Sequence, residues 1–162
     1  MLEITLKEEE FYDEATNRFF DLPAETFHLE HSLTSLSKWE SIHKKPFLSA
    51  EEKTREESLS YIECMCLTPG VTRKSLRRIS DKDMDLINYY ISDQKTATSI
   101  RRQRGGSREI ITAEIIYYWM VALTIPFEAA DWHLSKLLTL IEVCSIKNQP
   151  KKKMGRSEAL SR

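Results

Sequence analysis

The sequence predicts an α+β protein that is predominantly α-helical, in which a small N-terminal antiparallel strand pair precedes a helical bundle. Near the N-terminus, apolar and polar residues alternate with the two-residue period of a β-strand. From residue 33 onward, apolar residues recur every three or four positions, as on one face of an amphipathic helix. The chain has 162 residues, 41% of them hydrophobic, and is long enough to bury a core.

Three regions are expected along the chain. Residues 1–33 form a strand region that packs on the main domain, residues 34–148 form a helical domain, and residues 149–162 form a basic flexible tail. The two predicted strands cover residues 2–6 and 27–33, each with apolar residues at every second position. The stretch between these strands is compatible with either a strand or a short helix.

The first predicted helix begins at Leu33, carries apolar residues at every third position, and is closed by Pro46. Ser49 and Glu52 have the spacing of a capping box, in which each side chain pairs with a backbone N–H group of the other residue. They predict the start of a second helix, which is expected to end near Gly70.

N-cap residues and apolar positions also predict the remaining helices. Ser80, with two aspartates in the turn after it, predicts another helix start, and the polar residues 93–109 predict a loop. Thr112 is the expected N-cap of a helix that runs to Pro126, and a second long helix is expected over about residues 128–147. These last two helices are the most apolar part of the chain, so we expect them to form the core as a hairpin hinged at Pro126.

Charge is balanced over the whole chain but unevenly distributed along it. The 24 Lys and Arg residues and 25 Asp and Glu residues give a formal net charge of −1, so the chain has no overall attraction to nucleic acid or to an anionic membrane. Residues 1–30 carry nine acids and two bases, whereas residues 147–162 carry six bases and one acid. This asymmetry predicts acid-to-base docking, either between copies of the chain or onto another protein.

The cysteines and the apolar stretches indicate a soluble protein in a reducing compartment. There are three cysteines, an odd number, and residues 1–6 do not have the pattern of a secretory signal. The longest apolar stretch, residues 110–127, is interrupted by polar residues and falls short of the roughly 20 apolar residues that cross a bilayer. We therefore expect reduced thiols and no membrane segment.

Signatures of enzymes are missing from the sequence. It contains no Rossmann glycine motif, no P-loop, no nucleophile elbow and no HExxH motif. Cys64 and Cys66 lie two positions apart on a predicted helix and so point about 200° away from each other, which prevents one metal ion from binding both. We expect buried structural cysteines, no catalytic residue, no metal and no cofactor.

A basic segment is the first candidate for partner binding. It contains Arg101, Arg102, Arg104 and Arg108, which are expected to steer acidic surfaces toward the protein. Nucleic acid is not the expected ligand, because no aromatic residue for base stacking lies nearby and the chain as a whole is slightly acidic.

Three adjacent aromatic residues are the second candidate. Tyr117, Tyr118 and Trp119 cover about 200° of a helix circumference, so they cannot all face one core. Trp119 is expected to pack in the core, while one of the tyrosines is expected to lie in an exposed apolar patch that contacts a partner.

Two long segments resemble tail-module proteins of tailed bacteriophages. The first comprises residues 31–41 (HSLTSLSKWES), 45–48 (KPFL) and 53–54 (KT). The second comprises residues 111–120 (ITAEIIYYWM), 125–128 (IPFE) and 132–134 (WHL). Over most of residues 25–155, the chain is similar to a tail assembly chaperone family.

The resemblance implies a non-enzymatic protein of the host cell cytoplasm that binds the tape measure protein and helps the tail-tube protein to polymerise around it. Such proteins are often made in two lengths by ribosomal frameshifting, and the lysines at 151–153 lie where a slippery codon string would stand. Two alternatives stay open: a structural tail or baseplate component retained in the virion, and a nucleic-acid-binding regulator. Mass spectrometry of purified virions separates the first alternative from a chaperone.

Overall fold

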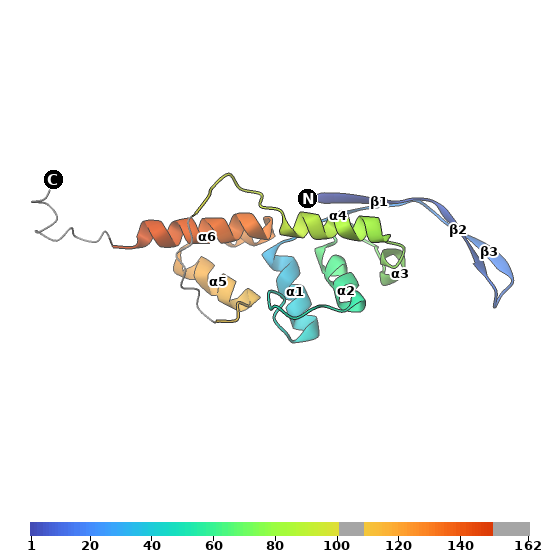
Figure 1. The fold of residues 1–162 in the computed structure, drawn as a ribbon, viewed down its shortest axis with the longest axis horizontal. Helices are drawn as coiled ribbons and strands as arrows, with labels where there is room; N and C mark the ends of the chain where they lie inside the picture. Colours follow the sequence, from blue (N-terminus) through green and yellow to red (C-terminus); the bar gives the residue numbers. More distant parts are fainter. Residues whose placement is uncertain (101–108, 151–162) are drawn as a thin grey trace, which may run out of the picture.

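The computed structural model describes residues 1–100 and 109–150 and shows an elongated α+β fold, which confirms the predicted class (Figure 1). In chain order the elements are β1 (Leu2–Leu6), β2 (Glu9–Asp13), β3 (Arg18–Leu22), β4 (Glu25–Leu29), α1 (Leu33–His43), α2 (Arg55–Met65), α3 (Arg73–Leu76), α4 (Asp81–Ser92), α5 (Ala113–Ala122), the 3-10 helix η1 (Phe127–Asp131) and α6 (Leu134–Asn148). No helix in these two ranges is long and apolar enough to cross a membrane.

The four strands form one long antiparallel ribbon with a break in the middle. β1 pairs with β4, placing Ile4 opposite Phe27, and β2 pairs with β3, placing Phe11 opposite Phe20. The stretch whose structure the sequence left open is therefore a second strand pair. The predicted strand over residues 27–33 is too long, because β4 ends at Leu29 and the next residues turn into α1.

Helix α1 begins where the sequence predicts. Ser32 is its N-cap, with Oγ accepting from the Ser35 backbone N–H, and Lys44 ends it in the left-handed region at φ 55°. Leu36 and Trp39 are fully buried, but Ile42 at the end of the predicted apolar stripe is exposed.

The predicted capping box at Ser49 and Glu52 is wrong. Helix α2 begins at Arg55, and the capping box is formed by Thr54 and Glu57, each side chain pairing with the other residue's backbone N–H. The Ser49 hydroxyl instead donates to the carbonyl oxygen of Pro46 within the preceding turn. Both Ser49 with Glu52 and Thr54 with Glu57 have side chains that suit a capping box. Ser49 is not available as a cap, because its hydroxyl is bonded within the turn after Pro46.

The C-terminal helices are shorter than predicted. α5 ends at Ala122 rather than at Pro126, and Thr124 adopts a positive φ of 54° in the turn that follows. The single helix expected over residues 128–147 is two elements, η1 and α6. They are separated at His133, whose backbone forms an isolated β-bridge with Ser32 and whose Nδ1 accepts from the Ser135 N–H to cap α6.

The apolar core consists of two clusters rather than one helical hairpin, so the prediction of a core built from the last two helices is wrong as stated. One cluster joins β1 and β4 to α1, α2, α3 and α4, and the other joins the start of α1 to α5, η1 and α6. α1 belongs to both clusters, through Trp39 and through Leu33 and Leu36 respectively. Helix α1 thereby ties the N-terminal and C-terminal halves together.

A buried carboxylate on α1 also positions α5. Glu40 accepts a hydrogen bond from the Ala113 N–H at one oxygen and from the Phe47 N–H at the other, both at 2.8 Å. Thr112 is the N-cap residue of α5 as predicted, but its side chain makes no capping hydrogen bond. Glu40 supplies the acceptor that the start of α5 needs.

Candidate functional site

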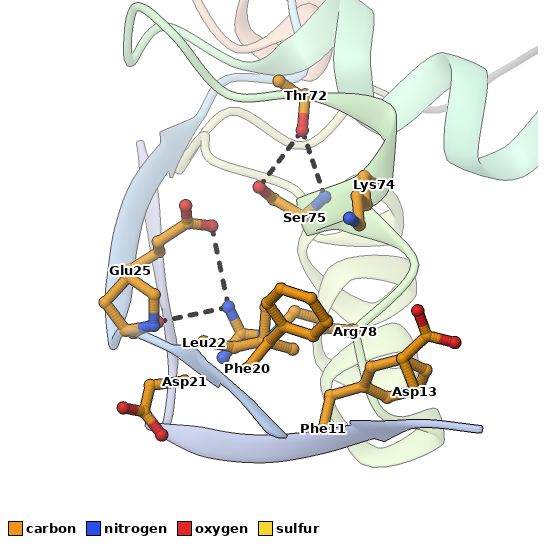
Figure 2. A pocket seen from close by; sticks show the side chains of 11 residues that line it. Phe11, Asp13, Phe20, Asp21, Leu22, Glu25, Thr72, Lys74, Ser75 and Arg78 are labelled. Carbon is orange, nitrogen blue, oxygen red and sulfur yellow. Dashed lines mark hydrogen bonds and ion pairs between the residues drawn. The ribbon is translucent and has the colours of Figure 1, made fainter. Parts of the chain in front are cut away.

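The β2–β3 hairpin projects from one end of the molecule and is called the arm below, residues 9–22 (Figure 1). A cleft of about 530 Å³ lies between the arm and α3. Figure 2 shows the rings of Phe11 and Phe20 on the arm side of the cleft, with Thr72 and Ser75 across from them. The full lining comprises Phe11, Asp13, Phe20, Asp21, Leu22, Pro23, Glu25, Thr72, Lys74, Ser75 and Arg78.

Arg78 holds the ribbon at the break between its two halves. Its guanidinium donates to the carbonyl oxygens of Lys7, at 2.6 Å, and Pro23, at 3.1 Å. The carboxylates of Glu9 and Glu25 approach the same guanidinium at 3.8 and 3.9 Å. Because proline has no N–H to donate to a ladder, the strands separate here and an arginine from the helical body occupies the gap. Arg78 therefore sets how the arm leaves the body.

The cleft is lined by both apolar and charged side chains. Its walls combine two aromatic rings with both signs of charge, and neither a histidine nor a cysteine is among its lining residues. The Thr72 hydroxyl is engaged locally, because it accepts from the backbone N–H of Ser75 as the N-cap of α3. The cleft can accommodate a side chain by packing and by charge pairing.

The predicted aromatic candidates lie at the opposite end of the molecule. On α5, Tyr118 is exposed, with 68% of its surface accessible, while Tyr117 and Trp119 are half-buried. Val121 and Phe127 are exposed on the same part of the chain, and the Phe127 ring lies 6.0 Å from that of Tyr117. We call Tyr118, Val121 and Phe127 the α5 patch. The other predicted candidates, Arg101, Arg102, Arg104 and Arg108, lie outside the described residues, as do residues 151–162 of the predicted tail.

A buried polar cluster joins the two halves of the molecule. His31 Nδ1 lies 2.6 Å from the Tyr61 hydroxyl, and the His31 and His133 rings meet edge to face at 5.3 Å. His133 Nε2 lies 3.0 Å from the Tyr90 carbonyl oxygen, and the Tyr90 hydroxyl donates to Glu30 at 2.8 Å.

The titration properties of this cluster follow from its burial. Burial, and secondarily the neighbouring His133, lower the pKa of His31 to about 4. Burial raises the pKa of Tyr61, and burial together with the hydrogen bond to Glu30 raises the pKa of Tyr90. These groups are therefore neutral near pH 7. All three side chains are buried, which is the arrangement of a polar contact that holds two halves together.

Cys64 is buried and Cys66 is half-buried, and burial raises the pKa of both thiols, which makes them poor nucleophiles. In residues 1–100 and 109–150, no group of three or more His, Cys, Asp or Glu side chains could hold a metal ion.

Neither the arm nor Arg78 was among the candidate binding residues predicted from the sequence. The signal was present as two aromatic pairs, at positions 11–12 and 19–20, set among acids. What the sequence did not reveal is that every residue of β2 and β3 is at least partly exposed to solvent. Comparison of the chain with known protein families, with curated proteins and with solved structures yields no match.

Proposed function

We propose that this protein is a non-enzymatic tail assembly chaperone of a tailed bacteriophage, which binds the tape measure protein and promotes assembly of the tail-tube protein around it. The observation that carries the proposal is the α5 patch, in which three large apolar side chains are each at least 60% exposed. An exposed apolar cluster of this kind is typical of a protein-binding surface.

The geometry of α5 suits a helical client. Tyr118 and Val121 are three positions apart and therefore lie on one side of the helix, away from Ile116 and Met120, which are fully buried. A client helix with an apolar stripe can pack along this side and bury surface that otherwise promotes aggregation. The identity of the client comes from the resemblance of residues 31–54 and 111–134 to phage tail-module proteins.

Co-purification tests the proposal. The tagged protein is co-expressed with the tape measure protein of the same phage, and the recovered client is quantified for the wild type and for Tyr118→Ala combined with Val121→Ser. The matched control is Tyr89→Ala, because Tyr89 on α4 is as exposed as Tyr118 but lies outside the patch. We expect at least a tenfold loss for the patch variant only. Equal recovery from all three proteins contradicts the proposal for this surface, and Arg102→Glu tests the predicted steering separately.

A further inference from the structure

The arm carries a second exposed aromatic surface, on the face that points away from the cleft. Directly opposed residues of an antiparallel pair share one face, so Tyr12 and Phe19 lie together there, flanked by Glu10 and Asp21. Their ring centroids are 4.9 Å apart, and Phe19 is 71% exposed. Asp21 is also among the residues that line the cleft, but in Figure 2 its side chain points away from the rings of Phe11 and Phe20. We call Tyr12, Phe19, Glu10 and Asp21 the outer face.

Hydrogen bonds at the base and at the tip of the arm hold the outer face in position. A two-stranded hairpin alone is only marginally stable in water, yet the arm is anchored at its base by Arg78 and closed at its tip by local hydrogen bonds. At the tip, Asp13 accepts from the Ala15 N–H and the Thr16 hydroxyl, and the Tyr12 hydroxyl donates to the Asn17 side chain. The Tyr12 ring is thereby fixed beside Phe19.

The charge of the outer face indicates the kind of partner that binds to it. Glu10 and Asp21 are paired across the strands, an arrangement in which two like charges repel. Neither has an ion-pair partner among the described residues, and the salt bridges of the arm involve only Glu9, on the opposite face. A cation placed between these carboxylates relieves their repulsion, and it lies next to the Tyr12 and Phe19 pair in the register of the strands, where aromatic rings attract Lys and Arg.

We propose that the outer face binds a basic amphipathic segment of a partner protein. The apolar side chains of that segment pack on Tyr12 and Phe19, and its Lys or Arg side chains pair with Glu10 and Asp21. The two rings together expose roughly the area of one aromatic side chain, about 200 Å², against about 800 Å² per partner in a standard interface. An interface of standard size therefore needs further contacts, which an unpaired edge of the arm can supply. This inference does not depend on the α5 patch, which lies at the other end of the molecule (Figure 1).

Fluorescence anisotropy with the full-length protein tests the inference. The probe is a labelled amphipathic peptide of about 18 Leu and Lys residues, and its matched control has Glu in place of every Lys. We expect the Lys peptide to bind and the Glu peptide not to bind. Tyr12→Ser combined with Phe19→Ser should weaken binding at least tenfold, while Tyr89→Ser and the α5 patch variant should bind as the wild type does. Equal binding of both peptides, or an unchanged affinity in the arm variant, overturns the inference.

A charge variant gives a readout that a purely structural role does not produce. In Glu10→Gln combined with Asp21→Asn, the cross-strand repulsion is removed, so the arm should become better protected against hydrogen exchange while the Lys peptide binds at least fivefold more weakly. Loss of protection together with loss of binding overturns the inference, because it shows only that the arm has unfolded. Sedimentation of the wild type is the last measurement. If the protein is a dimer that Phe19→Ser dissociates, the outer face binds a second copy of the chain, and the inference of a basic partner segment is overturned.

Discussion

Acidification to pH 5 should weaken the fold through His31 alone by about 2 kcal/mol. The folded protein holds this imidazole neutral, with a pKa of about 4, whereas an unfolded chain protonates it near the ordinary value of 6.5. The unfolded state thus binds more protons between these two values, so stability rises with pH in that window and is lost as pH falls from 6.5 toward 4. The difference of about 2.5 pKa units corresponds to about 3.4 kcal/mol once pH is below both values.

The groups that face His31 explain the size and sign of this effect. Desolvation disfavours the imidazolium first, His133 at 5.3 Å adds repulsion if it is charged, and Glu30 acts in the opposite direction without compensating. The Tyr61 hydroxyl at 2.6 Å from Nδ1 is itself neutral, because burial raises its pKa. The buried site therefore contains no anion that pairs with a charged His31 at hydrogen-bond distance.

Urea denaturation followed by tryptophan fluorescence measures the effect between pH 7.5 and pH 4.5. The wild type is compared with His31→Gln, which cannot titrate, and with His28→Gln on the neighbouring strand β4. We expect the slope of the unfolding free energy against pH to fall by about 1 kcal/mol per pH unit in His31→Gln relative to the other two proteins. Parallel curves for all three refute the reasoning, even if His31→Gln is less stable at every pH.

Two further predictions concern the arm and the second helix. Arg78→Met removes two charge-assisted hydrogen bonds to backbone carbonyls, so hydrogen exchange over residues 9–22 should speed up by tenfold or more, while Arg77→Met, at an exposed position, should leave it unchanged. Thr54→Ala should lower the unfolding free energy by about 1 kcal/mol in urea denaturation, because Thr54 caps α2. Ser49→Ala should change it by less than half of that, and the reverse order would place the helix start at Ser49 instead.

Most of the helical elements could be predicted because their signals are local. The aspartates after Ser80 form the predicted N-terminal turn of α4, and the apolar positions of α6 at Leu134, Leu137 and Ile141 are the buried ones. Each of these signals depends on residues within one or two turns of each other. The exposure of Tyr118 belongs to the same class, since adjacent positions on a helix cannot all face one core.

Of the two candidate binding surfaces, one could be predicted from the sequence and the other could not. That one aromatic residue of α5 must face outward could be foreseen, but the arm could not be recognised as exposed. Its aromatic residues stand in adjacent pairs, at positions 11–12 and 19–20, so each face of the ribbon carries two of them and the pattern does not indicate which face is covered. Whether such a strand is covered depends on which other elements reach it, and here a cleft lies between the arm and α3.

By itself, then, the amino-acid order determined the fold class, the presence of N-terminal strands and the main helical faces, because hydrogen bonding and side-chain periodicity act between near neighbours. Tertiary structure alone decided where α2 starts, that a β-bridge between Ser32 and His133 divides η1 from α6, and that Arg78 crosses to the carbonyls of Lys7 and Pro23. The β-bridge and the Arg78 hydrogen bonds join residues 55 or more positions apart. The start of α2 depends on which of two similar capping sequences is used. The energies of these features therefore depend on how the whole chain packs.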